Sequence, residues 1–393
     1  MRIIGTEAKG IRLPIITSGD DLESIVVESV LNASKQENFS LKNNDIIAIT
    51  EAIVARAQGN YATVDQIAQD IKNHFNGEPI GALFPILSRN RFSIILKAIS
   101  KASERVYLQL SYPSDEVGNH IVSLDQIDEK NIDPYRDNFN EIEFRKVFGE
   151  NTKHEFTGVD YIDFYKSMGD NIEIIFSNNP KYILNYTKNV IACDIHTRKR
   201  TKKILQNAGH NKIIGLDEIM NESIDGSGYN EEYGVLGSNK AGEERLKLFP
   251  RNCKEFVDNV KSKIDKETGK DINVMIYGDG AFKDPIEKIW ELADPVVSPG
   301  YTDGLKGTPN ELKLKYLADT KFKGLKGDDL NRELTNYIRG KNQSLVGNME
   351  SEGTTPRQIT DLVGSLCDLV SGSGDKGTPV VIVSGYFDNY SSL

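Results

Sequence analysis

Ile359-Thr-Asp-Leu-Val-Gly-Ser-Leu-Cys-Asp-Leu-Val-Ser-Gly-Ser-Gly-Asp-Lys-Gly-Thr-Pro-Val-Val-Ile-Val-Ser-Gly385 is the stretch that most clearly indicates how this chain folds. Apolar residues recur at three- and four-residue steps from Ile359 to Val370, which is typical of an amphipathic helix. Glycines break the pattern between Ser371 and Gly377, and the β-branched run from Pro379 to Val383 predicts a buried strand. We therefore predict a helix, a glycine loop and a strand in succession.

The rest of the chain shows the same mixture of helical and strand patterns. The predicted helices are 22–31, 92–102, 201–207 and 253–264, and the predicted strands are 45–50, 171–176, 188–193 and 272–277. Residues 119–150 mix acids, Asn and Pro without a sustained period, so we interpret them as a loop-rich connection with little chemistry. No internal repeat or long linker forces a boundary, and we predict one mixed α/β domain of the α+β kind over residues 1–393.

Composition excludes several classes of function. With 393 residues, 38% hydrophobic and 27% charged, the chain can bury a large core, and its formal net charge of −10 argues against nucleic acid and anionic membrane as partners. The three cysteines are widely spaced, and the first residues are charged where a signal peptide needs an apolar run. We expect a cytoplasmic protein without disulfides or membrane spans.

The loop from Ser371 to Gly377 is the first candidate site. Its residues are Ser371, Gly372, Ser373, Gly374, Asp375, Lys376 and Gly377, and its unobstructed backbone N–H groups suit a phosphate. However, the loop follows a helix and precedes a strand, whereas known phosphate loops follow a strand and open a helix. Taken alone, the loop is better interpreted as a surface turn.

Carboxylates supply the candidate metal ligands. Asp160 and Asp163 lie three residues apart, and Asp279 stands between glycines where a predicted strand ends. Carboxylate oxygens are the hard ligands that hold Mg²⁺ or Mn²⁺ beside phosphates. On spacing alone, solvated loop acids for the first pair and a simple turn for the third remain open.

Other reactive residues give weaker signals. The histidines share no ligand-like spacing, no Gly-x-Ser-x-Gly elbow occurs, and Cys367 lies on an apolar helix face where a core role is preferred. The basic run from Arg198 to Lys203 is interpreted as a solvated helix face. Covalent hydrolysis is therefore disfavoured.

Four blocks in order resemble the coenzyme F-420 gamma-glutamyl ligase family. They are Leu13–Leu22 with Asn44–Gly59, Gly158–Asp163, Asn273–Gly280 and Ile359–Gly385. The second is similar to the family's Gly-Val-Asp-x-Ser-Asn, and the third to the strand before its Asp-Thr/Ser-x-Gly-Arg segment. The chain departs from the family at three positions: Arg56 replaces a lysine, Asp163 an asparagine and Gly278 an acid.

The resemblance implies a fold, ligands and site residues. It implies an intertwined homodimer that binds GTP and a divalent metal, Mg²⁺ or Mn²⁺, near the subunit interface. The metal ligands would be Asp160 and Asp279. The nucleotide would contact Leu13, Pro14, Ile15, Ile16, Glu51, Ala52, Arg56, Asp163 and the loop 371–377. Residues 119–150 and 192–269 look enlarged or divergent.

The implied reaction is amide-bond formation. The nucleotide would activate a carboxylate acceptor as an acyl phosphate, and the amine of an amino acid would then displace phosphate. Glutamate is the amino acid that the resemblance favours. Two alternatives stay open: a ligase for a different acceptor, and a nucleotide- or metabolite-binding protein that has lost turnover. The departures at Asp163 and Gly278 motivate the second alternative.

Overall fold

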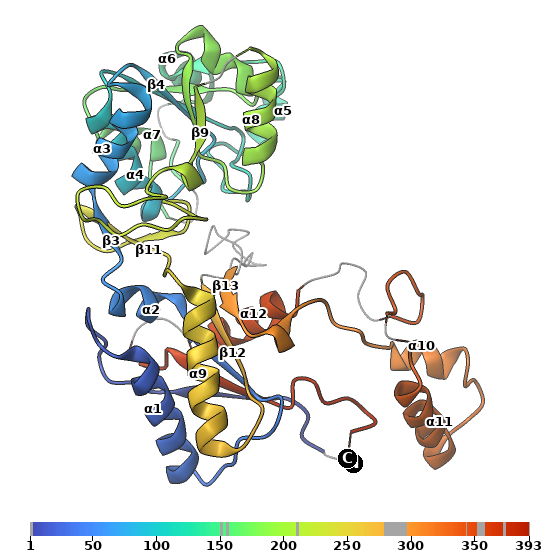
Figure 1. Cartoon of the computed structure of the whole chain (residues 1–393). Coiled ribbons are helices and arrows are strands. Elements are labelled where there is room, and N and C mark those ends of the chain that lie inside the picture. The colour runs from blue at the N-terminus through green and yellow to red at the C-terminus, as the bar shows by residue number, and fades with distance from the viewer. Residues whose placement is uncertain are drawn as a thin grey trace.

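The computed structural model shows two lobes built on different sheets (Figure 1). It describes residues 3–149, 152–154, 157–209, 212–278, 297–342, 344–351, 358–371 and 375–392. The lower lobe contains the chain's first segment and much of its last third, and the upper lobe contains the residues between (Figure 1). The mixed α/β class predicted from the sequence is confirmed.

A five-stranded sheet forms the centre of the lower lobe. In spatial order its strands are β1 (Glu7–Ile11), β14 (Val380–Ser384), β2 (Ile46–Thr50), β12 (Asn273–Gly278) and β13 (Val297–Tyr301). β2 and β12 are parallel, and the other neighbours are antiparallel. Because parallel strands end at the same sheet edge, Thr50 and Tyr277 lie side by side there.

Helices cover both faces of this sheet. The apolar sides of α1 (Leu22–Gln36) and α9 (Cys253–Thr268) pack with one face in a single core cluster. On the other face, α12 (Ile359–Ser371) buries Val363 and Cys367 against β12 and β14. The short helix α2 (Glu51–Ala57) begins where β2 ends.

The upper lobe is built on a six-stranded sheet. Its spatial order is β6 (Phe139–Asn140), β7 (Ile172–Phe176), β5 (Val106–Leu110), β4 (Ile80–Leu83), β8 (Asn189–Ala192) and β9 (Ile213–Gly215). All pairs are parallel except β6 with β7. The chain runs outward from β4 through β5 to β7, then returns to the other side of β4 for β8 and β9. This reversal is characteristic of a doubly wound sheet.

The upper helices lie on both sheet faces. They are α3 (Val64–Phe75), α4 (Arg91–Ala102), α5 (Leu124–Glu129), α6 (Glu141–Phe148), α7 (Tyr161–Lys166) and α8 (Arg198–Asn207), with 3-10 turns η1 (Pro180–Asn185) and η2 (Leu216–Glu218). α3, α4 and α7 share the larger apolar cluster of this lobe, whereas η1 and α8 share the smaller one. The two clusters contain different strand residues, as expected for opposite faces.

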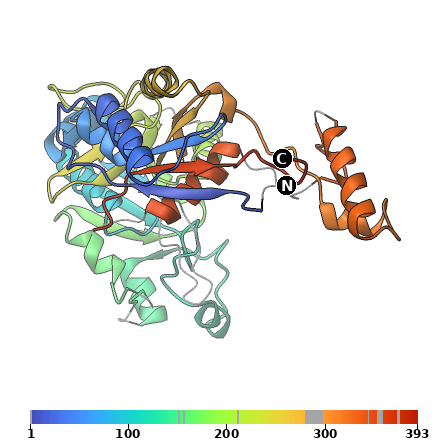
Figure 2. The same cartoon turned by 90° about the horizontal axis from the view of Figure 1, so that it is seen from below.

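A small sheet joins the lobes. β3 (Tyr61–Thr63) leads from α2 to α3, and β10 (Ser238–Lys240) and β11 (Arg245–Leu248) lead back to α9. The chain therefore crosses between the lobes through neighbouring strands. After η3 (Asp303–Leu305), the helices α10 (Leu314–Asp319) and α11 (Gly327–Arg339) form an arm that stands off the body (Figure 2).

The predicted helices and strands are confirmed, and one segment needs correction. Residues 119–150 were expected to be loop-rich, yet they contain α5 and α6. Both helices begin with a capping box, formed by Ser123 with Gln126 and by Asn140 with Glu143. Such short helices are stabilised by their ends more than by a repeating apolar stripe, so periodicity misses them.

Gly81 in β4 offers a test of the upper core. A Cβ atom at this position would lie against Ile183, 2.8 Å from its Cδ1. We expect Gly81→Ala to lower the free energy of unfolding by about 1–3 kcal/mol, the usual cost of overpacking. Chemical denaturation measures this, and Gly81→Ala combined with Ile183→Ala should cost less than the sum of the two single changes. Simple additivity would contradict the close packing.

Candidate functional site

The first and last sequence blocks meet at one edge of the lower sheet. The Leu13 amide donates to the Gly377 carbonyl at 3.3 Å, and the Thr50 amide donates to the Pro379 carbonyl at 3.0 Å. The Arg12 side chain also donates to the Lys376 carbonyl, at 3.4 Å. The structure thus brings the opening segment, the start of α2 and the end of the glycine loop together.

The nucleotide residues implied by the resemblance differ in exposure. Pro14 and Ile15 are exposed, Leu13 is half-buried and Ile16 is buried. Asp375, Lys376 and Gly377 are exposed, and Ser371 is buried at the end of α12, whereas Gly372, Ser373 and Gly374 lie outside the described residues. Ala52 is half-buried and Arg56 is exposed, both on α2.

Glu51 is the charged centre of this region. Its side chain is 2% exposed and accepts a hydrogen bond from the Lys247 ammonium at 2.7 Å. Asn239 donates to the same carboxylate oxygen at 3.2 Å. A buried carboxylate needs such partners, because removing an unpaired charge from water costs several kcal/mol.

Gly278 makes room for Glu51. A Cβ atom at Gly278 would lie 2.9 Å from the Glu51 Cγ and 3.3 Å from the Phe249 ring. The Glu51 side chain thus fills the space in front of the position where the family pattern has an acid. The neighbouring Tyr277 hydroxyl faces Ser371, and burial raises the pKa of Tyr277. The end of β12 therefore lies next to the end of α12.

The structure does not bring Asp160 and Asp163 to this site. Asp160 caps α7 in the upper lobe: one oxygen accepts from the Ile162 and Asp163 amides, and the other accepts from Arg145 and Thr152. Asp163 pairs with Arg145 at 2.6 Å. α7 lies beside the upper sheet and away from α2 (Figure 1). Asp279, the other expected metal ligand, lies outside the described residues.

A second segment fits the family pattern better in space. Gly234-Val-Leu-Gly-Ser-Asn239 has the glycine, valine, serine and asparagine of Gly-Val-Asp-x-Ser-Asn at the same spacing. Asn239 in β10 contacts Glu51. The Ser238-Asn239 pair is the sequence signal that marks this segment, whereas the segment 158–163 matches the pattern only at its glycine, valine and aspartate. Leu236 occupies the aspartate position here.

The described residues do not form a metal site by themselves. No group of three or more His, Cys, Asp and Glu side chains with metal-binding geometry occurs within the described ranges. Glu51 supplies one carboxylate, which Lys247 already contacts. Leu236 and Gly278 supply none where the family pattern has acids.

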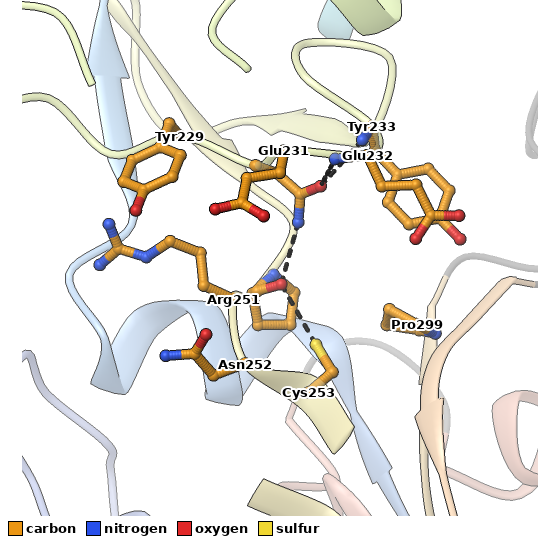
Figure 3. A pocket seen from close by; sticks show the side chains of 10 residues that line it. Tyr229, Glu231, Glu232, Tyr233, Arg251, Asn252, Cys253 and Pro299 are labelled. Carbon is orange, nitrogen blue, oxygen red and sulfur yellow. Dashed lines mark hydrogen bonds between the residues drawn. The ribbon is translucent and has the colours of Figure 1, made fainter. Parts of the chain in front are cut away.

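A pocket of about 160 Å³ lies between the segments 229–233 and 250–253 (Figure 3). The Arg251 guanidinium lies 4.7 Å from the Tyr229 ring centre, and Glu231 belongs to the same pocket lining. Cys253 and Pro299 form another part of the wall. The charges of Glu51 and Glu232 add to burial in raising the pKa of Cys253 to about 12, so this pocket is within electrostatic reach of Glu51.

The cysteines should be chemically inert in the folded protein. Cys193, Cys253 and Cys367 are all buried, and burial raises the pKa of each thiol, to about 12 for Cys253 and Cys367. Because a raised pKa keeps a thiol protonated, we expect no alkylation by iodoacetamide at about pH 8. Mass spectrometry should show three modifications only after denaturation. Rapid labelling of Cys253 in the native protein would contradict its burial.

The site combines the ends of the chain with one internal segment, and comparison with known proteins identifies the class. The model of the family described as F420-0:Gamma-glutamyl ligase matches residues 10–385. The chain therefore belongs to this family of ligases. No curated protein sequence matches the chain. None of the helices that the structure describes is long and apolar enough to span a membrane.

Proposed function

We propose that this protein is a nucleotide-dependent ligase that joins an amino acid to a carboxylate acceptor, with L-glutamate as the favoured amino acid. One observation carries the proposal: in a member of the gamma-glutamyl ligase family, Glu51, Lys247 and Asn239 form a buried polar cluster where the first and last blocks meet. Buried, mutually oriented charges beside a pocket are typical of an active site.

The reaction would have two steps. The acceptor carboxylate attacks the terminal phosphorus of GTP, giving an acyl phosphate and GDP. The amine of the amino acid then attacks the acyl carbon, inorganic phosphate leaves, and a proton is lost from nitrogen. Both steps gather anionic oxygens, so fixed positive charge and oriented N–H groups lower the barrier.

The residues of the chain divide this work. We assign the phosphates to the region between Leu13 and Asp375–Gly377, where the hydrogen bond from the Leu13 amide to the Gly377 carbonyl holds the two ends of the chain together. The Lys247 ammonium is a compact positive charge that Glu51 holds in place. In this proposal it offsets the negative charge of phosphates bound beside Glu51. Asn239 donates to the same oxygen of Glu51 as Lys247 does and helps to fix the carboxylate.

A divalent ion, Mg²⁺ or Mn²⁺, is part of the proposal as the usual partner of GTP. Bound, it would neutralise charge on the phosphates. Glu51 is the described carboxylate best placed to contribute to it, and Asp279 follows β12 directly in sequence. The described residues give no complete set of metal ligands. The proposed roles of Lys247 and Arg251 do not depend on the metal ion.

The Arg251 pocket is proposed to hold the amino acid. A guanidinium binds a carboxylate through two parallel hydrogen bonds, and stacking on Tyr229 fixes its plane. Glu231 and Glu232 lie in the same wall and suit the ammonium group. The electrostatic effect of Glu51 on Cys253 in the pocket wall supports a position of this amine near the phosphates.

A nucleotide- or metabolite-binding protein without turnover is the second candidate. Leu236 and Gly278 favour it, because both stand where the family pattern has acids. A ligase for an acceptor other than the deazaflavin is the third, since Arg251 and the pocket come from the divergent region 192–269.

The test is a product assay with pure protein. GTP or ATP is supplied with Mg²⁺ or Mn²⁺, glutamate and a panel of carboxylate acceptors, while phosphate release and amide products are followed. We expect an amide whose formation needs nucleotide, and a higher KM for the amino acid in Arg251→Ala. Lys254→Ala, an exposed neighbour on α9, is the matched control. Nucleotide binding without any amide product would favour the binding protein.

A homodimer is also proposed, as the family resemblance implies. The arm of α10 and α11 stands off the body (Figure 2), and Val346 and Met349, which follow α11, are 80% and 72% exposed. Apolar side chains exposed on a projecting segment suit contact with a second copy. Light scattering should give twice the chain mass, and a strictly monomeric protein would refute the dimer.

A further inference from the structure

The doubly wound sheet of the upper lobe has a cavity at the point where its strand order reverses. A cavity of about 180 Å³ lies just beyond the carboxyl ends of the central strands. Phe84 follows β4, Ser111 follows β5, and Thr197 precedes α8. Open sheets of this kind bind ligands at this crevice. The Glu51 cluster lies in the other lobe, so this is a separate place in the molecule.

Two buried polar side chains, Asp194 and Gln109, adjoin residues that line this cavity. Asp194 is fully buried: Oδ2 accepts from the hydroxyls of Thr197 and Thr201, both lining the cavity, each at 2.7 Å. Its Oδ1 has no hydrogen-bond partner among the described residues. Gln109 at the end of β5 is fully buried too, and its Oε1 is likewise unpartnered there. Such atoms are rare in proteins and are often satisfied by a bound molecule or water.

The Phe84 backbone is strained at the same place. Phe84 has a φ of 54°, the left-handed region that bulky residues avoid, and its amide donates to the Gln109 carbonyl at 2.9 Å. Strain of this kind is found disproportionately at binding sites. The half-buried Phe84 is part of the wall of the cavity.

The local charges exclude a phosphate. The Glu116 carboxylate accepts from the amides of Ile195, His196 and Thr197, at 2.5, 3.2 and 3.2 Å. These amides lead into α8, so the protein's own carboxylate already occupies this helix N-terminus, where an anion would otherwise bind. The segment after β4, residues 84–90, also lacks the glycines of a phosphate fingerprint.

Arg200 adds a hydrogen-bond donor to this wall. The basic run 198–203 was expected to be one solvated face, but its members differ. Arg198 pairs with Asp217 at 2.9 Å and Lys202 pairs with Glu218, whereas Arg200 lines the cavity. The expectation describes the exposed Lys199, Arg200 and Lys203 well, although Arg200 also lines the cavity.

We propose that this cavity binds an unphosphorylated sugar ring, as a free monosaccharide or as the ribose of a nucleoside. Sugar hydroxyls both donate and accept, and the wall offers both: the hydroxyls of Ser111 and Ser114, the guanidinium of Arg200 and the carboxylate of Glu116. Phe84 gives an apolar surface for the ring face. The size fits, since a cavity of about 150 Å³ holds benzene.

Calorimetry on the full-length protein tests the proposal. The probes are D-ribose, D-glucose, adenosine and guanosine, with adenosine and guanosine 5′-monophosphates for comparison. We expect binding of free sugars, of nucleosides or of both, which identifies the source of the ring, and weaker binding of the monophosphates. Arg200→Ala and Ser114→Ala should each weaken binding by about tenfold, the loss of one good hydrogen bond. Neither side chain has a described internal hydrogen bond that folding would lose.

Two controls separate this cavity from the proposed ligase site. Lys199→Ala changes an exposed neighbour of Arg200 and should bind like wild type. Glu51→Gln alters the lower lobe and should retain sugar or nucleoside binding, whatever the product assay shows. The proposal is overturned if no neutral sugar or nucleoside binds, if Arg200→Ala and Ser114→Ala both bind normally, or if Glu51→Gln abolishes binding.

Discussion

Replacing Lys247 by methionine is expected to lower the free energy of unfolding by about 3–5 kcal/mol. Glu51 is 2% exposed, and it accepts hydrogen bonds from the Lys247 ammonium and the Asn239 amide. Methionine keeps most of the side-chain volume but leaves the carboxylate without its counter-charge in a low-dielectric environment. Chemical denaturation followed by circular dichroism measures the loss.

The double change Glu51→Gln with Lys247→Met provides the matched control. Removing both charges takes away the attraction and the cost of burial together, so the double variant should be more stable than Lys247→Met alone. Lys261, which pairs with Asp265 at a half-exposed position, supplies a comparison. Lys261→Met should cost much less, since exposed pairs contribute about 0–1 kcal/mol. Equal losses at Lys247 and Lys261 would show that the Glu51 pair is not buried in solution.

Glu51→Gln is expected to lower kcat/KM of amide formation by about 10²–10³-fold, the usual effect of losing one preorganised polar group. Glutamine keeps the shape of the side chain, so packing in front of Gly278 is retained. Its neutral amide no longer fixes the Lys247 charge beside the phosphates. Steady-state kinetics with the acceptor found in the product assay measures the change.

A second variant separates this effect from a packing defect. Gly278→Ala leaves all charges in place but puts a Cβ atom 2.9 Å from the Glu51 Cγ. If the position of Glu51 matters, Gly278→Ala should also lose activity while Glu51→Gln remains folded. Full activity in both variants would remove Glu51 from the active site.

Three strands and one helix of the lower lobe were predicted well, because each is marked by a pattern within its own short stretch of sequence. The β2, β12 and β14 strands are buried runs of β-branched residues between polar turns, and α12 has a regular apolar stripe. The strand reversal of the upper lobe was not predicted, because which strands pair depends on contacts between distant segments. Strand patterns alone do not carry that information.

The site was predicted in part for the same reason. Leu13 and the loop ending at Gly377 come together because they flank the paired strands β1 and β14, of which the sequence predicted only β14. Lys247 was missed, since its role arises from a contact with Glu51 across 196 positions of the chain. Arg251 was missed because no sequence motif marks its stacking on Tyr229. Asp160 looked like a metal ligand, but an aspartate just before a helix is also an N-cap, and that is the role the structure gives it.

Calorimetry of GTP binding with Mg²⁺ to wild type, Glu51→Gln and Asp160→Asn is the most direct test of where the active site lies. We expect Glu51→Gln to weaken GTP binding by about tenfold or more, equivalent to about 1.4 kcal/mol, and Asp160→Asn to bind GTP like wild type. Normal GTP binding by Glu51→Gln together with lost binding by Asp160→Asn would contradict the assignment of the site to the lower lobe.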